Sequence, residues 1–156
     1  MDAKANYLTS AGAAELRGEL RHLIEVRKPE MARKLKAAVA QGDLKENADY
    51  HDAKEQLGFI EGRVRQLEAI LRDAVVVEAG AGNDEVRVGS TVLIREDGED
   101  EAEEYQIVGS AEANPRQRKI SLESPIGAAL LGKSQGKKIK VQTPDGIIRF
   151  KIVAVR

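Results

Sequence analysis

The chain has 156 residues, a formal net charge of −1 and no cysteine, a length that suits one ordinary domain or two small ones. Without cysteine there are no disulfides or thiolate metal sites, and the chain lacks the basic surplus of proteins that bind nucleic acid by neutralising phosphates. The first residues show no apolar run of a signal peptide, and no stretch approaches the ~20 apolar residues of a membrane span. The composition therefore favours a cytoplasmic protein that does not enter membranes.

The first half of the chain begins with a long helical pattern. Thr9 or Ser10 can cap a helix that starts near Ala11. Apolar residues then recur at helical spacing at Leu16, Leu20, Leu23, Ile24, Met31, Leu35, Ala38 and Val39. Pro29 removes a backbone hydrogen bond and is expected to kink the helix. Gly42 is expected to end it in the left-handed conformation.

A second helical pattern follows, and its spacing is more regular. Apolar residues at Ala53, Leu57, Ile60, Val64, Leu67 and Leu71 follow the alternating steps of four and three that are typical of a coiled-coil seam. Each helix would run about 45 Å at 1.5 Å per residue. Because only a few residues join the two helices, they must fold back on each other. Residues 1–76 therefore predict an antiparallel coiled-coil hairpin with its tip at residues 41–50.

Around Val75 the pattern changes to short runs rich in β-branched residues. After a run at 74–77 and a Gly-rich linker, strand candidates occur at 90–97, 103–109, 118–124, 137–144 and 146–155. Asp145-Gly146 predicts a hairpin turn between the last two. The acidic run 96–104 predicts a solvated hairpin loop with no assigned function.

One short helix is expected within this second half. Ser124 is a good N-cap, Pro125 suits the first helical position, and Gly132 can mark the end. Residues 77–156 therefore predict a small α+β domain with a mostly antiparallel sheet.

The segment between the two long helices gathers acidic side chains. Asp43 and Glu46 stand three residues apart, as in a capping box in which each side chain accepts a hydrogen bond from the other residue's amide. With Asp49, Asp52 and the amide Asn47, however, the same segment offers the hard oxygen ligands that suit Mg²⁺. On spacing alone, both interpretations stay open. An exposed carboxylate pair would hold Mg²⁺ weakly and would need a partner to supply further ligands.

The chain strongly resembles the bacterial Gre family of transcript-cleavage factors, GreA type. The resemblance rests on "GDLKENADYHDAKEQLGFIEGRVRQLEA", "VGSAEA" and "ISLESPIGAALLGKSQGKKIKVQTPDG", and it extends over essentially the whole chain. It implies an α+β protein with an N-terminal antiparallel coiled coil and a C-terminal domain of FKBP-like fold. It also implies a factor that binds RNA polymerase, inserts its coiled coil into the secondary channel and stimulates the polymerase's own cleavage of backtracked nascent RNA. The paired helices leave no obvious seam for a second chain, which favours a monomer. Such a factor is a catalytic accessory and not itself an enzyme.

The resemblance also assigns roles to residues of the tip. The two essential acids of the family fall on Asp43 and Glu46, which would hold a second Mg²⁺ shared with the polymerase active site and not tightly bound by the factor alone. Lys45, Asn47 and Tyr50 match the motif and would shape the tip or contact RNA. As plain solvated or packing residues they would need no such role.

Two further sets of residues carry over from the family. Lys54 aligns with an arginine thought to contact the RNA 3′ segment, although a solvated helix residue is the better explanation of Lys54 alone. A second basic position of the family is Val39 here, which weakens the expected basic patch. The polymerase-docking loop falls on Glu123, Ser124, Pro125 and Ile126, where helix capping by Ser124 is expected as well.

Two other functions remain open at this point. A Gre homologue could occupy the channel and inhibit transcription without promoting cleavage, but such homologues alter the tip, which is intact here. The chain could also be a coiled-coil adaptor with a merely structural tip. The resemblance of its C-terminal half to the Gre family argues against this.

Overall fold

The computed structural model describes residues 6–78 and 84–156, which group into two compact units. One unit is Ala14–Asp73, and the other joins the described residues up to Ala13 with those from Ala74 to Arg156. The boundary predicted between residues 76 and 77 differs from this grouping, because the start of the chain pairs with residues 74–77. Part of the predicted Gly-rich linker, residues 79–83, lies outside the described residues.

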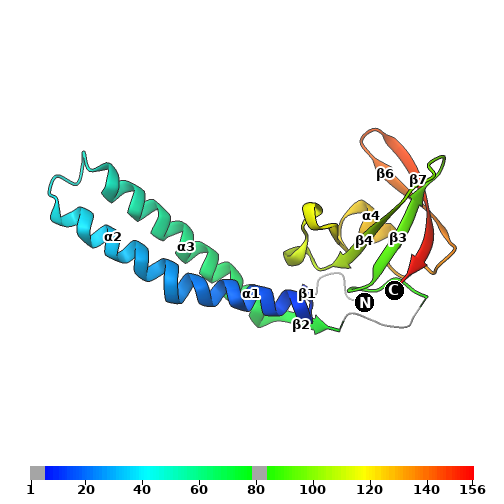
Figure 1. Cartoon of the computed structure of the whole chain (residues 1–156), viewed down its shortest axis with the longest axis horizontal. Helices are drawn as coiled ribbons and strands as arrows, with labels where there is room; N and C mark the ends of the chain where they lie inside the picture. Colours follow the sequence, from blue (N-terminus) through cyan, green and yellow to red (C-terminus); the bar gives the residue numbers. More distant parts are fainter. Residues whose placement is uncertain (1–5, 79–83) are drawn as a thin grey trace. The chain divides into compact units, whose positions relative to one another are not determined.

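The first unit is an antiparallel helical hairpin (Figure 1). Helix α1 (Ser10–His22) begins in the other unit and continues through a π-helical turn, η1 (Leu23–Arg27), into α2 (Lys28–Ala40), and α3 (Ala48–Asp73) runs back beside them. The side chains buried in this hairpin are Leu16, Met31, Ala38, Ala53, Ile60 and Leu67. These six residues belong to the predicted apolar patterns, so the seam between the helices is confirmed.

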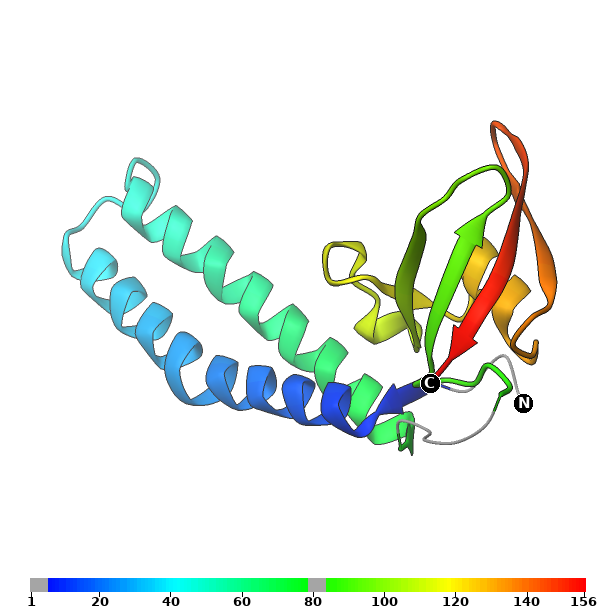
Figure 2. The same cartoon turned by 45° about the vertical axis from the view of Figure 1, so that its right-hand side comes forward.

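The π-helical turn explains where the first apolar pattern fails. A π turn holds more residues than an α turn and bends the helix that contains it, and Figure 2 shows the helix curving here. The turn lies just before Pro29, the second residue of α2, where a distortion was expected. Ile24 lies within the turn and is 44% exposed, so its assignment to the buried stripe is wrong.

Val39 is also wrongly assigned to the buried stripe, since it is 48% exposed. It directly follows Ala38, which is 2% exposed. Successive helical residues are about 100° apart around the axis, so the residue next to the buried Ala38 points away from the centre of the seam.

A two-stranded parallel sheet ties the start of α1 to the second unit. Strand β1 (Asn6–Thr9), which the sequence did not predict, pairs with β2 (Ala74–Val77). Thr9 Oγ1 accepts a hydrogen bond from Gly12 N at 3.0 Å, which confirms a cap at this end of α1. The Glu112 carboxylate accepts from Thr9 N at 2.7 Å and from Thr9 Oγ1 at 2.6 Å. The buried threonine is therefore fully paired.

The rest of the second unit is built on a five-stranded sheet of order β5-β4-β3-β7-β6. Its strands are β3 (Thr91–Glu96), β4 (Ala102–Val108), β5 (Lys119–Ser121), β6 (Lys138–Thr143) and β7 (Gly146–Val155). Only the β4–β5 pair is parallel among the pairs of this sheet. The strand candidates and the mixed α+β class are confirmed.

One short helix, α4 (Pro125–Leu130), packs on the core of this sheet through Leu130, which is fully buried. Its position confirms the helix expected after Ser124. The short 3-10 turns η2 (Ser110–Glu112) and η3 (Pro115–Gln117) connect β4 to β5. None of the helices in residues 6–78 and 84–156 is long and apolar enough to cross a membrane.

The two hairpins of the sheet differ in detail from expectation. Thr143 pairs directly with Gly146, so the turn residues are Pro144 and Asp145 and not the predicted Asp145-Gly146 pair. The acidic run joins β3 to β4 and is exposed from Asp97 to Glu101, as predicted for a solvated loop.

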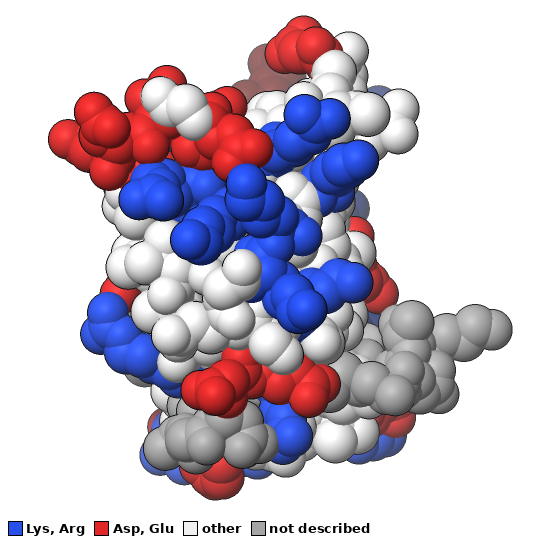
Figure 3. Space-filling model, turned by 90° about the vertical axis from the view of Figure 1, so that its right-hand side faces the viewer, with Lys and Arg blue, Asp and Glu red and all other residues white. Residues whose placement is uncertain are grey.

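The charged side chains of this unit are grouped by sign. Figure 3 shows acidic side chains gathered beside a band of basic ones.

Candidate functional site

The tip of the hairpin is the connection between α2 and α3. Helix α2 ends with hydrogen bonds from Gln41 N to the Ala38 carbonyl at 3.1 Å and from Gly42 N to the Val39 carbonyl at 3.3 Å. Gly42 has a φ of 93°, so the predicted left-handed end of the helix is confirmed. Open space surrounds this glycine, and its backbone angle alone therefore favours glycine.

Asn47, not Asp43, caps the second helix. Its Oδ1 accepts a hydrogen bond from Tyr50 N at 3.0 Å, while its Nδ2 donates to the Ala38 carbonyl at 2.7 Å. One amide thus joins the end of α2 to the start of α3. A carboxylate cannot do this, because it has no donor.

The predicted capping box is therefore wrong. Helix α3 begins at Ala48, too late for Asp43 to cap it. Asp43 Oδ1 instead accepts a hydrogen bond from Lys45 N at 3.3 Å, within a local turn. In the described part of the chain, the Glu46 carboxylate makes no hydrogen bond or ion pair. Neither acid is used to start the helix.

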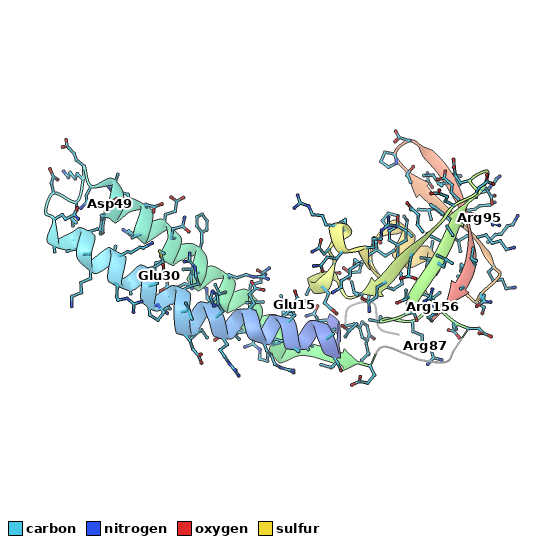
Figure 4. The ribbon with its side chains drawn as sticks, in the orientation of Figure 1. Glu15, Glu30, Asp49, Arg87, Arg95 and Arg156 are labelled. Carbon is cyan, nitrogen blue, oxygen red and sulfur yellow. The ribbon has the colours of Figure 1, made fainter. Side chains whose placement is uncertain are left out.

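Asp43 and Glu46, which do not cap α3, line one shallow, open hollow at the tip. Its lining residues are Gln41, Gly42, Asp43, Glu46, Asn47, Ala48 and Asp49. Asp43, Glu46 and Asp49 are all exposed, and Figure 4 labels Asp49 where α3 begins. Asp52 does not line this hollow but a neighbouring one, together with Lys34. The tip therefore presents three carboxylates, while the fourth predicted acid lies further along α3.

The donor set is of the kind that Mg²⁺ prefers, because it consists of carboxylate oxygens in a setting that leaves room for water. Within residues 6–78 and 84–156, however, no three acidic, histidine or cysteine side chains are close enough together to hold a metal ion. The tip thus supplies carboxylate ligands that suit Mg²⁺, but not a complete set of them. A Mg²⁺ ion there would need further ligands from a partner.

An aromatic pair lies beside the acids. The rings of Tyr50 and His51 meet edge to face with centroids 5.3 Å apart, and Lys54 Nζ lies 5.8 Å from the Tyr50 ring centroid. His51 Nε2 lies 3.3 Å from the Lys45 carbonyl oxygen. The sequence analysis missed His51, since no spacing rule links it to the turn. Lys54 is exposed and rests on Tyr50, so its cation is held near the tip.

An ion pair braces the hairpin away from the tip. Arg63 Nε donates to Glu19 Oε1 at 2.7 Å and Arg63 Nη2 donates to Glu19 Oε2 at 3.0 Å. These bonds raise the pKa of the Arg63 guanidinium. Bidentate pairs of this kind fix geometry as well as charge, so the two helices are held in register.

The predicted docking loop precedes α4, and hydrogen bonds hold it rigidly. Ser124 Oγ accepts from Gly127 N at 3.1 Å and donates to the Ser121 carbonyl at 2.6 Å, which confirms the predicted cap. Ser110 Oγ donates to Glu123 Oε2 at 2.6 Å and lies 2.9 Å from Ser121 Oγ. Because the Ser110 proton goes to the carboxylate, Ser121 donates to Ser110. Sequence reasoning missed both of these serines.

The four predicted docking residues do not share one environment. Glu123 and Pro125 are exposed, and Ser124 is half-buried in its cap. Ile126 packs against the core of the sheet domain. The surface of this loop is therefore formed by Glu123 and Pro125, while Ile126 mainly anchors the loop from beneath.

Asn47→Asp is expected to loosen the tip without unwinding α3. The aspartate keeps an acceptor for Tyr50 N, but it loses the donor to Ala38 and places an oxygen against that carbonyl. We expect unchanged helix content by circular dichroism and a free energy of unfolding lower by about 1 kcal/mol. Thermal melts measure this loss.

Asn114→Asp is the matched control for this change. Asn114 also caps a turn through its Oδ1, which accepts from Arg116 N at 3.1 Å, and its amide donates no side-chain hydrogen bond in the described part of the chain. Its melting temperature should equal that of the parent. A melting temperature for Asn47→Asp that also equals the parent's would contradict the role given to the Asn47 amide.

Known proteins match this chain over both halves. A model described as "Transcription elongation factor, N-terminal" matches residues 6–76, and one described as "Transcription elongation factor, GreA/GreB, C-term" matches residues 81–156. Transcription elongation factor GreA of Chloroflexus aggregans is 46% identical over 100% of both chains. GreA of Caldanaerobacter subterraneus subsp. tengcongensis is 48% identical over 99% of both chains. A solved structure, GreA factor homolog 1 of Thermus thermophilus, is 33% identical over 98% of this chain and 99% of that one, with a TM-score of 0.46.

The two matching models and the full-length relatives assign this helical hairpin and its small α+β domain to a class of transcription elongation factors. The chain belongs to the GreA/GreB family of these factors. The family implies an accessory role and an interaction with RNA polymerase.

Proposed function

We propose that this elongation factor stimulates the cleavage of backtracked nascent RNA by RNA polymerase, after inserting its helical hairpin into the secondary channel. The observation that carries this proposal is the state of Asp43 and Glu46. Both acids are exposed at the hairpin tip, and neither is used to cap α3. A purely structural tip would need neither carboxylate.

The tip acids would act together with groups of the polymerase. A Mg²⁺ ion shared with the polymerase active site would activate water and neutralise charge that develops on the scissile phosphate. Asp43, oriented by its hydrogen bond from Lys45 N, is the main protein ligand in this proposal. Glu46 completes the ligand set or accepts the proton of the attacking water. The factor alone binds the ion weakly.

The other residues of the proposal orient the tip and bind RNA or the polymerase. Asn47 and Tyr50 fix the tip turn. The Lys54 cation, which lies near the Tyr50 ring, contacts the RNA 3′ segment in this proposal. The loop from Glu123 to Ile126 docks on the polymerase at the rim of the channel. The factor acts as a monomer, because each helix of the hairpin already buries its apolar seam against the other.

The test uses the purified full chain and a stalled, backtracked elongation complex with Mg²⁺. We expect release of short 3′ RNA fragments followed by renewed synthesis. Loss of synthesis without fragments would identify an inhibitor of the channel instead. If the protein changed neither the release of RNA fragments nor RNA synthesis, the adaptor role would be the remaining interpretation.

A further inference from the structure

Helix α1 is capped at its start by a residue from a distant part of the chain. In a capping box, the third residue after the N-cap is a Glu or Gln whose side chain accepts a hydrogen bond from the N-cap amide. The N-cap here is Thr9, whose Oγ1 accepts from Gly12 N, and Gly12 has no side chain that could complete the box. Glu112 completes it instead, because its Oε2 accepts from Thr9 N at 2.7 Å. The box is thus divided between two segments that lie 103 residues apart in the sequence.

Gly12 leaves the room that this arrangement needs. A methyl group at Gly12 would overlap the Glu112 carboxylate, and the three atoms nearest to it all belong to that side chain. Glu112 Oε1 accepts from Thr9 Oγ1 at 2.6 Å, so both oxygens of the carboxylate are bonded to the threonine. The negative charge lies at the positive end of α1, where the helix dipole favours an anion. The residues on both sides of the contact therefore fit each other.

A second glycine brings the same two segments together. Gly109 is buried, and a methyl group there would overlap the carbonyl oxygen of Tyr7 in β1. The 3-10 turn η2 begins one residue later, at Ser110. Tyr7, Thr9, Gly12 and these residues all belong to the same compact unit. The start of α1 is thus held against η2 by close backbone packing as well as by Glu112.

The first residue of η2 is bonded to the loop before α4. Ser110 Oγ donates to Glu123 Oε2 at 2.6 Å and lies 2.9 Å from Ser121 Oγ. Because η2 has only three residues, it contacts the proposed docking loop through Ser110 and the start of α1 through Glu112. The loop that would bind polymerase and the helix that leads to the tip therefore share one short support.

We propose that Glu112 is a positioning residue, which fixes the first turn of α1 to the docking loop so that a docked factor presents its tip acids at a defined place. This inference rests on the proposed function, in which residues 108–113 have no role. Helix α1 continues through η1 into α2, which ends at the tip. A rotation of about 5° at the start of a helix about 45 Å long moves its far end by about 4 Å. A displacement of about 1 Å at a reacting group can lower a rate about 100-fold.

A cap that served only the stability of α1 would not need this arrangement. Glutamate at position 12 would complete the box within the helix itself. Glycine inside a helix is destabilising relative to residues with a side chain. The chain instead has a glycine at this helical position and takes the carboxylate from η2. The consequence that a local cap lacks is the connection between α1 and η2.

The test measures fragment release from a backtracked elongation complex with full-chain variants. Glu112→Ala removes the carboxylate, and Gly12→Ala expels it by placing a methyl group in its position. Both should lower the rate at saturating factor at least about tenfold. The factor concentration for half-maximal cleavage should change less than about twofold, because the docking loop keeps its own cap at Ser124. Since both changes remove one contact, the double variant should be no slower than either single variant.

A further variant separates positioning from capping, and it combines Gly12→Glu with Glu112→Ala. The introduced glutamate can accept from Thr9 N within α1, so the box is complete but its link to η2 is absent. Hydrogen exchange of the Thr9 amide should be about fivefold faster than in the parent for Glu112→Ala, and should return to the parent rate in the combined variant. The melting temperature should recover as well. Cleavage at saturation should stay at least about tenfold below the parent rate.

Gly18→Ala is the matched control. It makes the same change as Gly12→Ala on the same helix, at a glycine with nothing within 4 Å of the added methyl group. It should cleave at the parent rate and raise the melting temperature, because alanine favours a helix.

Three results would overturn the proposal. These are cleavage at the parent rate by Glu112→Ala, recovery of the rate in the combined variant, or unchanged exchange of the Thr9 amide in Glu112→Ala. If Glu112→Ala does not fold, the combined variant carries the same test, because it keeps a cap. A parent protein that releases no fragments would instead refute the proposed function. The exchange of the Thr9 amide, measured without polymerase, would still decide whether Glu112 holds the start of α1.

Discussion

Asp43→Asn is expected to reduce stimulated RNA cleavage about 100-fold or more, since loss of a charged metal ligand removes several kcal/mol of transition-state stabilisation. The substitution keeps the shape of the side chain and an oxygen that can accept from Lys45 N. The local turn should therefore survive. The measurement is the single-turnover rate of fragment release from a backtracked complex at saturating factor.

The controls for this prediction separate charge from structure. Asp52→Asn makes the same chemical change nine residues further along, on α3, at a residue that does not line the tip hollow, and it should cleave at the parent rate. Because Asn47 caps α3, Asp43→Asn should also leave helix content and melting temperature unchanged. Cleavage by Asp43→Asn at the parent rate would refute a ligand role for Asp43.

Much of the fold could be predicted because its signals are local. The apolar steps from Ala53 to Leu71 define the seam face of α3 without reference to any other segment. Ser124 and Pro125 likewise mark the start of α4 within a few residues. Strand β1 could not be found in this way. Its four residues include only one that is fully buried, Leu8, and its pairing partner β2 lies far along the chain.

The tip shows where local signals mislead. Asp43 and Glu46 have the spacing of a capping box, but a cap depends on where the helix begins. That point is fixed by Asn47, whose amide satisfies Ala38 on the preceding helix as well as Tyr50 on its own. The second bond is a tertiary contact, and no pattern along the sequence contains it.

Charge is a second property that the sequence conceals. Total charge is balanced, and its average over each half is balanced too. The register of β3, β7 and β6 nevertheless brings Arg95, Lys151 and Lys138 into one row. Pairing register is set by the sheet as a whole, so a local excess of cations can arise where composition predicts none.

Gly127→Ala is expected to displace the docking loop and to lower the free energy of unfolding by about 1–3 kcal/mol. A methyl group at Gly127 would overlap the carbonyl oxygen of Ser121. That carbonyl accepts the hydrogen bond from Ser124 Oγ, and Ser124 in turn caps the helix at Gly127 N. The backbone cannot yield without opening this cap. Chemical denaturation and binding to polymerase measure the two effects.

Gly58→Ala is the matched control, with an expected change of opposite sign. Gly58 lies in the interior of α3 with nothing within 4 Å of the added methyl group. Alanine at an open helical position should raise the free energy of unfolding by about 0.5–1 kcal/mol. If Gly127→Ala matched this control in stability and in polymerase binding, the close contact with Ser121 would have no consequence.

Asp43→Asn and Gly127→Ala should affect different parameters of the same cleavage reaction. Weakened docking raises the factor concentration needed for half-maximal cleavage and leaves the rate at saturation intact, provided the variant remains folded. Loss of the tip carboxylate lowers the rate at saturation and leaves the half-maximal concentration unchanged. A Gly127→Ala protein whose saturated rate also fell would show that the loop before α4 orients the tip as well as binding polymerase.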